Sequence, residues 1–383
     1  DEAGLVTEYE YDSMGRVIKA FDNAGNRMKY EYDGAGNLVK QTDVIGREAV
    51  YAYDQFGRLT SVTGTDNATT AYAYDKLDRL VSVTAADGRT TAYQYDKAGN
   101  LVGMTEPGEA VYTYAYDEIN RLTRKVNPLG AATTFQYDAN GNLTGVMDGE
   151  GVESSYQYDA LNLLTTLTDG NGNNTAYEYD ELSRLLSVTT PEGNKQEYRY
   201  DALGNLTKSK DANGLVTEYV YDVMGNVVQS ISPLGAVTAY TYDKHDELTG
   251  VTDALGGVTA YKVDLNRQVT ELIQANGGRY QYTYDQVQRL TGIKTPLGYE
   301  QQFLYDDADN IKKTVDNLGR VETFEYDIMH RMTRSVNAKG GVETYGYDAR
   351  GNQNRITNAL GYTYSLQYDL LDQLTASIDP EGK

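Results

Sequence analysis

Short runs of alternating polar and apolar residues fill the chain, and Gly, Asn and Asp interrupt them at regular intervals. Alternation with a period of two is typical of strands that bury one face, whereas helices repeat every 3.6 residues. A Tyr-Asp pair marks the interruptions and recurs every 21 residues, from Tyr11-Asp12 to Tyr368-Asp369, with no insertion or deletion. Eighteen Asp lie on this grid, and Tyr precedes all of them except one, which follows Val263. A fixed period of this length identifies a repeat architecture.

Each repeat contains two turn signals. Counting from the grid Asp as zero, Gly, Asn or Asp occupies position +3 in fourteen copies, and Gly occupies position +13 in sixteen. These residue types accept the positive φ that tight turns require. Ser183, Arg267, Gln288 and His330 depart from this rule at position +3. Two turns separated by two strand-like runs predict about 36 antiparallel strands in one meander, so we expect an all-β fold that forms a single array over residues 1–383.

The tyrosines have a fixed parity within the repeat. A second aromatic residue usually lies at position −3, and all 36 Tyr fall at odd offsets, so an unbroken strand would place them on one face of the sheet. Apolar residues at +5 and +8, such as Leu59 and Val62, have opposite parity, which predicts a β-bulge or a +5 residue that still belongs to the turn. The repeat signature is represented by Tyr9, Tyr11, Asp12, Gly15, Tyr51, Tyr53, Asp54, Gly57, Tyr93, Tyr95, Asp96, Gly99, Tyr198, Tyr200, Asp201 and Gly204.

The repeated Tyr and Asp each have two interpretations. The Tyr rings would either bind sugars or line a cargo surface, or they would form a structural ladder of stacked rings interleaved with aliphatic side chains. We favour the ladder, because a binding site rarely needs the same residue in every repeat. The grid Asp would either bind calcium or start the following turn by accepting backbone N–H groups. We favour the turn, since calcium requires six to eight oxygen ligands in one place.

Composition and charge narrow the classes of partner. The formal net charge is −22, which repels the phosphates of nucleic acid and the surface of an anionic membrane. The chain has no Cys, and no apolar run approaches the roughly 20 residues that span a bilayer. We therefore expect neither nucleic-acid binding nor membrane insertion. Because the sequence begins with Asp1 and shows no signal peptide, we expect it to be part of a longer protein.

The sequence offers little for catalysis. Its two His, His245 and His330, occupy ordinary turn positions and are expected to be solvated. Catalysis needs an asymmetric constellation of different groups, which a near-perfect repeat does not provide. Every Gly is explained by turn spacing, so no phosphate-binding loop is predicted. We expect no enzyme activity, no cofactor and no metal site; an activity on a polysaccharide through the loop carboxylates is the enzymatic alternative.

The unit Tyr-x-Tyr-Asp-x-x-Gly-Arg-Leu, as it stands at 51–59, resembles the YD repeat of the rearrangement-hotspot (Rhs) proteins, the C components of insecticidal toxin complexes, bacterial wall-associated proteins and the animal teneurins. The resemblance covers essentially the whole chain. It implies a long antiparallel strip of β-hairpins that spirals into a hollow shell or open barrel, which in toxin members encloses a carboxy-terminal toxin. We find neither the self-cleaving core segment nor a toxin domain of such members within this sequence, so autoproteolysis and toxicity are expected to lie outside it.

Simple geometry agrees with a hollow form. About 36 strands at roughly 4.8 Å give a strip on the order of 170 Å wide, and sheets this wide must curl because strands twist. Our leading hypothesis is an encapsulating scaffold of a secreted or surface-exposed bacterial protein, with its own C-terminal toxin or cargo domain as partner. The alternative is an adhesin that binds cell-surface glycans. Three departures from the repeat, at Val263, at Gly108-Glu109 and at Asn67, are expected to be loosened or bulged hairpins.

Overall fold

The computed structural model describes residues 5–383, and within them thirty-six β-strands form one antiparallel sheet in chain order. Each strand pairs with its neighbours in sequence, from β1 with β2 to β35 with β36. In the described part of the chain no pairing joins β36 back to β1, so the sheet is an open strip rather than a closed barrel. The predicted all-β meander of hairpins is confirmed.

The strands have nearly constant length, five to seven residues each. Odd-numbered strands end on the residue before the grid Asp, and even-numbered strands begin at or near position +5. Their bounds are β1 Thr7–Tyr11, β2 Val17–Asp22, β3 Arg27–Tyr32, β4 Leu38–Thr42, β5 Glu48–Tyr53, β6 Leu59–Thr63, β7 Thr69–Tyr74, β8 Leu80–Thr84, β9 Thr90–Tyr95, β10 Leu101–Glu106, β11 Ala110–Tyr116, β12 Leu122–Val126, β13 Ala132–Tyr137, β14 Leu143–Met147, β15 Glu153–Tyr158, β16 Leu164–Thr168, β17 Asn174–Tyr179, β18 Leu185–Thr189, β19 Lys195–Tyr200, β20 Leu206–Lys210, β21 Val216–Tyr221, β22 Val227–Ile231, β23 Val237–Tyr242, β24 Leu248–Thr252, β25 Val258–Val263, β26 Val269–Ile273, β27 Arg279–Tyr284, β28 Leu290–Lys294, β29 Glu300–Tyr305, β30 Ile311–Asp316, β31 Val321–Tyr326, β32 Met332–Val336, β33 Val342–Tyr347, β34 Gln353–Thr357, β35 Thr363–Tyr368 and β36 Leu374–Ile378.

A β-bulge sits at the start of each even-numbered strand. In the third hairpin Tyr53 lies opposite Leu59, whereas the preceding residue Ala52 lies opposite Ser61, so one residue is left without a partner. Tyr51 then lies opposite Val62. The bulge therefore brings positions +5 and +8 onto the same face as the tyrosines at −1 and −3. This confirms the bulge predicted from the parity of the apolar positions.

The opposite face of the sheet is polar and carries ion pairs between neighbouring strands. Lys40 on β4 lies 2.8 Å from Glu31 on β3 and 3.1 Å from Glu48 on β5. The hydrogen bond to Glu31, followed by that to Glu48, raises the pKa of Lys40. Pairs of this kind on a solvated face contribute little stability, so they mainly fix register and keep the face soluble.

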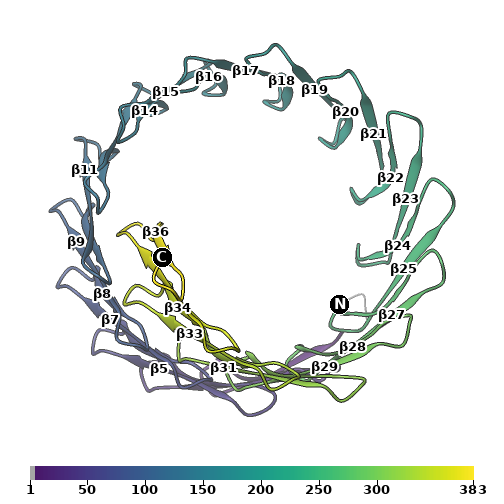
Figure 1. Cartoon of the computed structure of the whole chain (residues 1–383). Coiled ribbons are helices and arrows are strands. Elements are labelled where there is room, and N and C mark those ends of the chain that lie inside the picture. Colours follow the sequence, from purple (N-terminus) through teal and green to yellow (C-terminus); the bar gives the residue numbers. More distant parts are fainter. Residues whose placement is uncertain (1–4) are drawn as a thin grey trace.

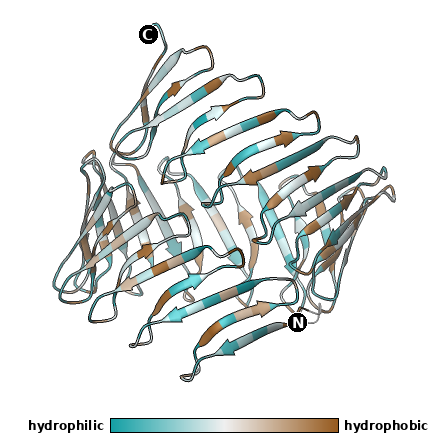
Figure 2. Ribbon diagram, turned by 90° about the horizontal axis from the view of Figure 1, so that it is seen from below, coloured by the Kyte–Doolittle hydropathy of each residue, from teal (hydrophilic) through white to brown (hydrophobic). Residues whose placement is uncertain are grey.

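The strip curls into a ring and then continues past its own start (Figure 1). Because the strands alternate in direction, the turns that follow each grid Asp, the Tyr-Asp turns, lie along one long edge, which we call the Tyr-Asp edge. The turns that begin ten residues later, the return turns, lie along the other, the return edge. We call β1–β25 the first coil and β26–β36 the second coil. In side view the N-terminal and C-terminal ends lie at opposite ends of the ring axis (Figure 2).

The circumference follows from contacts between the two coils. Arg47 of the first coil contacts Asp309 of the second, 262 residues later, which at 21 residues per repeat is about twelve and a half repeats. About 25 strands spaced by 4.8 Å require a ring at least about 40 Å across, too wide for side chains to fill. Among residues 5–383, Ala110 is the one apolar residue whose side chain is fully buried. The other apolar side chains are half-buried or exposed, so the molecule is a wall without a filled core.

The three departures from the repeat keep their strand pairing. Val263 lies opposite Val269 with the same bulge as its neighbours. Asn67 adopts a φ of 65° and closes the same turn as Gly does elsewhere. At Gly108-Glu109 both residues have positive φ, but the flanking strands still pair up to Glu106 and Ala110. The three hairpins therefore have no bulge beyond the one that every repeat carries, and their looser exchange stays a prediction.

Candidate functional site: the repeat ladder and the spiral seam

Each Tyr-Asp turn is a three-residue hairpin loop that ends on a positive-φ residue. In the first copy, Gly15 N–H donates to the Asp12 carbonyl at 3.1 Å and Asp12 N–H donates to the Arg16 carbonyl at 2.9 Å. Gly15 has a φ of 77°. The Asp12 carboxylate accepts backbone N–H bonds from Met14 and Arg16, both at 2.9 Å. The carboxylate thus organises its own turn, in the manner of an Asx-turn followed by a one-residue bulge.

The same turn recurs at the other signature positions. The backbone N–H bond from Arg16 holds the pKa of Asp12 below its ordinary value, as that from Arg184 does for Asp180. In residues 5–383 no group of three or more acidic or His side chains has an arrangement that would hold a metal ion. Asp54, Asp96 and Asp201 accept backbone N–H bonds in the same way, and Gly57, Gly99 and Gly204 have φ values of 79°, 95° and 94°.

The tyrosine at position −1 ties most hairpins to the one before. The Tyr116 hydroxyl donates to the Leu101 carbonyl at 2.9 Å, one hairpin back. That carbonyl lies at the bulge, where the sheet ladder leaves it free to accept. Burial raises the pKa of Tyr116, since it favours the neutral phenol. Equivalent bonds of 2.6–3.0 Å are made by Tyr32, Tyr95, Tyr137, Tyr158, Tyr200, Tyr221, Tyr242, Tyr284, Tyr305, Tyr326, Tyr347 and Tyr368.

An arginine at position +4 adds a second link between hairpins. Arg79 Nε donates to its own grid carboxylate, Asp75, at 2.8 Å, while its Nη1 donates to the carbonyl of Asp96, the next grid Asp, at 2.8 Å. Its guanidinium also lies over the Tyr95 ring, 4.9 Å from the centroid, a favourable cation–π position. Arg16, Arg58, Arg121, Arg184 and Arg289 repeat this arrangement. The signal was present in the Gly-Arg-Leu of the repeat unit, although the pattern alone did not assign the Arg a role.

The aromatic residues at position −3 face +8 residues of mixed type, such as Val62 and Met104 in two hairpins and Ser209 in a third. Tyr51, Tyr93 and Tyr198 are half-buried, opposite the +8 residues of their own hairpins. Tyr9, on the outermost strand, is exposed and packs beside Tyr11 with ring centroids 6.4 Å apart. This is the one ring pair in the described residues, so the tyrosines of successive hairpins do not stack directly on one another. A spacing of about 10 Å between equivalent strands is too wide for rings to stack, and hydroxyl and guanidinium groups bridge it instead.

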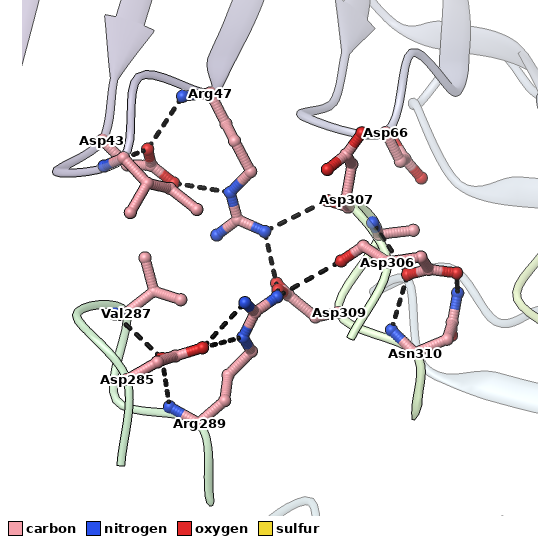
Figure 3. A network of polar contacts seen from close by, with 12 residues as sticks. Asp43, Arg47, Asp66, Asp285, Val287, Arg289, Asp306, Asp307, Asp309 and Asn310 are labelled. Carbon is pink, nitrogen blue, oxygen red and sulfur yellow. Dashed lines mark hydrogen bonds and ion pairs between the residues drawn. The ribbon is translucent and has the colours of Figure 1, made fainter. Parts of the chain in front are cut away.

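The second coil rests on the first along a seam of unlike edges, where Tyr-Asp turns of the second coil meet return turns of the first. Figure 3 shows one such contact: Arg47, in the return turn after β4, points at Asp309 in the Tyr-Asp turn after β29. Arg47 Nη1 lies 2.6 Å from the Asp309 carboxylate and 3.0 Å from the Asp307 carbonyl. Arg289, from the neighbouring second-coil turn, reaches the same Asp309 oxygen at 2.6 Å. One carboxylate therefore joins three turns from two coils.

Two of the four residues that break the +3 rule, Gln288 and His330, reach across this seam. Gln288 keeps a φ of 69°, which is strained for a side chain of its length, and its amide donates to Asn26 of the first coil at 3.0 Å. His330 keeps a φ of 60° and lies 3.0 Å from the Asp66 carboxylate of the first coil. Glycine would relieve the backbone at both positions but would have no side chain to reach across. The sequence departs from turn chemistry where the coils meet.

Arg350 is the most connected residue of the seam. Its Nη1 donates to the Pro107 carbonyl at 2.8 Å, and its guanidinium reaches Glu106 at 3.2 Å and Asp372 at 2.8 Å. Arg89 of the first coil donates back to the Arg350 carbonyl at 2.6 Å. The hydrogen bond to Asp372 is the main cause that raises the pKa of Arg350. The side chain is wedged between two return turns and only 11% exposed.

Both histidines lie in turns, as expected; His330 is exposed but has polar partners, whereas His245 is largely buried. The His330 ring is bound between Asp66 across the seam and Asn310 of the neighbouring turn. His245 is only 11% exposed, and its Nδ1 lies 3.4 Å from Asp243. The contact from His330 to Asp66 joins the two coils, which no local pattern indicates, and the His330 side chain remains 44% exposed. No helix in residues 5–383 has the length and apolar character that crossing a membrane requires.

Two family models match the chain. The Rhs repeat matches residues 32–69, 74–111, 95–132, 305–342 and 347–383. The teneurin YD-shell matches residues 115–261 and 163–318, which together cover more than half of the sequence. No curated protein matches the chain.

Solved structures with a similar fold are parts of much longer chains. The crystal structure of TcdB2-TccC3-Cdc42 is similar with a TM-score of 0.62 and 15% identity, over 95% of this chain and 25% of that one. The crystal structure of TcdB2-TccC3 without its hypervariable C-terminal region is similar with a TM-score of 0.60 and 14% identity, over 95% of this chain and 26% of that one. The structure of the Photorhabdus luminescens Tc holotoxin pore is similar with a TM-score of 0.51 and 15% identity, over 96% of this chain and 26% of that one. The chain spans about a quarter of these relatives, and at such identities the likeness shows the fold.

Proposed function

We propose that this chain, which belongs to the family of Rhs-repeat and YD-shell proteins, forms part of the wall of a hollow shell that encloses a polypeptide cargo. The observation that carries the proposal is closure: the strip returns to its own start and is bonded there through Arg47, Arg350 and His330. A display surface for ligands or an enzyme would not need a seam. In this proposal the chain acts as a container and contributes no catalytic group.

The wall is suited to excluding other macromolecules. Hydroxyl–carbonyl and guanidinium–carbonyl bonds join successive hairpins at most junctions of the described array, so the sheet has few weak places between its repeats. Most of the −1 tyrosine hydroxyls, and many of their ring faces, are already used inside this wall rather than offered to a glycan. We therefore prefer the container to the adhesin.

The cargo and the location are finer parts of the same proposal. One similar structure is of TcdB2-TccC3 without a hypervariable C-terminal region, which by analogy supports a cargo C-terminal to the repeats. Figure 2 places the C-terminal end at one mouth of the ring, where a following segment could turn inward. We propose that the protein is secreted or displayed on a bacterial surface and carries its own C-terminal toxin or other cargo domain.

Protease protection tests the container directly. An unstructured reporter peptide is fused after Lys383 and digested at low protease concentration. We expect cleavage to be slowed by about ten-fold relative to the free peptide, because a protease must enter the lumen or wait for the wall to open. A variant with a weakened seam, Arg350→Ala with Arg47→Ala, should lose most of this protection, whereas the wall variant Leu304→Asp should keep it. Equal cleavage of the fused and the free peptide would contradict the proposal.

A further inference from the structure

Both free edges of the spiral carry exposed apolar side chains at one fixed position of most turns. On the return edge the residue before the turn glycine is Leu in most of the later turns, and Leu234, Leu255 and Leu297 are 95%, 96% and 98% exposed. Leu318 and Leu360 continue the series. Successive return turns lie about 10 Å apart, so these side chains form a regular arc rather than scattered exposures. We call the return turns within residues 232–362 the leucine arc.

The leucine arc is also uncharged overall, on a chain of net charge −22. Its seven turns contain two acidic residues, Asp253 and Asp316, and two basic ones, Arg320 and Lys339. Return turns under the seam differ: they present Arg47, Asp66, Asp87 and Arg89 to the second coil. The return edge is therefore polar where the second coil of the same chain covers it, and apolar where no other part of the described chain lies on it.

The free part of the Tyr-Asp edge matches this arc. Position +2 of its turns holds a large apolar residue in most first-coil copies, with exposures between 66% and 83%. At the seam the same position is covered: Val287 and Met329 are half-buried, and Arg350 lies between two return turns. Position +2 is thus the position that a return edge covers. The exposed members of this row are Met14, Phe56, Leu77, Ile119, Leu161, Leu182, Leu203 and Met224.

We propose that the leucine arc is a docking surface for the free Tyr-Asp edge of a second copy of this chain, which continues the spiral from one molecule into the next. The contact would repeat the seam already present within the molecule, with the same two edges in the same order. When the second copy is placed in register with the seam, its Ile119 lies between Leu234 and Leu255, and its Leu182 lies between Leu297 and Leu318. Each pairing buries apolar side chains that are otherwise in water.

The two edges are unlike, so the contact is heterologous and does not close on itself. A stack of molecules would grow into a tube, limited by the negative charge of each copy. Salt screens that repulsion but leaves apolar burial intact, so association should strengthen as salt is added. The seam within the molecule, which depends on ion pairs, should show the opposite trend.

The experiment measures mass in solution by sedimentation velocity over a range of protein concentrations. Wild-type protein should show species that grow with concentration and with salt. The return-edge variant Leu255→Asp with Leu297→Asp, and the Tyr-Asp-edge variant Ile119→Asp with Leu182→Asp, should each remain monomeric. Their equimolar mixture should form a dimer and nothing larger, because each variant keeps one intact edge. Leu304→Asp, on the face of the wall and 40% exposed, is the matched control and should associate like wild type.

Three results would overturn the proposal. The wild-type chain stays monomeric at every concentration; the mixture of the two variants fails to form a dimer; or Leu304→Asp abolishes association as fully as the edge variants do. Circular dichroism of each variant shows whether its sheet is intact, and the serine substitutions Leu255→Ser with Leu297→Ser provide a milder pair at the same positions. These outcomes do not depend on whether the shell encloses cargo.

Discussion

At the scale of the residue, the hydroxyl of the ladder tyrosine has the clearest measurable role. It satisfies the carbonyl at position +5 of the preceding hairpin, next to the bulge and beyond the pairs that β10 forms with β11. The Arg at +4 adds a bond to the next grid carbonyl and covers the next Tyr ring. Stability between hairpins is thus supplied by individual polar groups at fixed positions.

Removing one hydroxyl should weaken one junction. Tyr116→Phe leaves the Leu101 carbonyl without its donor and should cost about 1 kcal/mol in the free energy of unfolding. The reverse change is available at the repeat that lacks Tyr: Val263→Tyr should supply a donor for the Leu248 carbonyl and slow exchange of nearby amide protons. Hydrogen exchange resolved along the chain measures both. No change in exchange near residues 101 and 116 in Tyr116→Phe would contradict the role of the hydroxyl.

The same residues define how stability depends on pH. Hydrogen bonds lower the pKa of grid Asp such as Asp12 and Asp180. These carboxylates therefore stabilise the fold fully above their unfolded-state pKa of about 3.9, and that stabilisation is lost as pH falls through the folded-state pKa. Burial raises the pKa of Tyr116 and Tyr326. These neutral phenols therefore stabilise the fold fully below their unfolded-state pKa of about 10, and that stabilisation is lost as pH rises through the folded-state pKa. Urea unfolding should show a plateau between these limits; greatest stability below pH 3 would contradict it.

At the scale of the element, the hairpin is the unit that the sequence specifies locally. The 21-residue period, the turn residues and the opposite parity of +5 and +8 together predicted the strands, both turns and the bulge. These features depend on neighbours within one hairpin, which is why sequence patterns reveal them. The role of Arg at +4 was missed, because its acceptor belongs to the next hairpin and is a backbone carbonyl, which has no sequence signature.

At position +3 the local turn and the seam favour different residues: the turn favours Gly, and the seam favours a long polar side chain. Gln288→Gly should relieve the positive-φ strain of its own turn, by about 1 kcal/mol, but should remove the bond to Asn26. We expect slower exchange within the turn that contains residue 288 and faster exchange at the return turn around residue 26. Gly204→Gln, on the free edge, is the matched control and should only destabilise its turn. Faster exchange at both turns of Gln288→Gly would contradict the strain argument.

At the scale of the whole molecule, the seam is the feature that sequence patterns did not predict. It joins residues about 260 apart, and their meeting depends on the small angle that each hairpin adds to the curl of the strip. The sequence did mark the seam, through Gln288 and His330 at a position that holds Gly, Asn or Asp in fourteen of the eighteen copies, but this mark could be interpreted only once the circumference was known. The width of the strip was enough to predict a hollow form, but it was not enough to predict that the second coil would bind the first.

Arg350 is the residue whose loss should open the seam most. Arg350→Ala leaves Glu106 and Asp372 without their shared cation and frees the Pro107 carbonyl, which should cost about 1–3 kcal/mol. Exchange should quicken in the return turns at 85–89 and 106–110 and in the second coil together. Added salt should have a similar but weaker effect in the wild-type chain. Arg121→Ala, which removes equivalent bonds within the first coil, should affect only its own hairpins; a change confined to residue 350 would contradict the seam.

The distance across the seam tests closure of the strip most directly. The chain has no Cys, so Cys introduced at Ile45 and Asp307 can carry the only two spin labels. With the coils in contact, pulsed dipolar spectroscopy should give one narrow distribution at short distance, because the turns after β4 and β29 touch. A strip that stayed open would separate these turns by about 25 strand spacings, on the order of 120 Å. A broad distribution, or no dipolar coupling at all, would contradict the spiral.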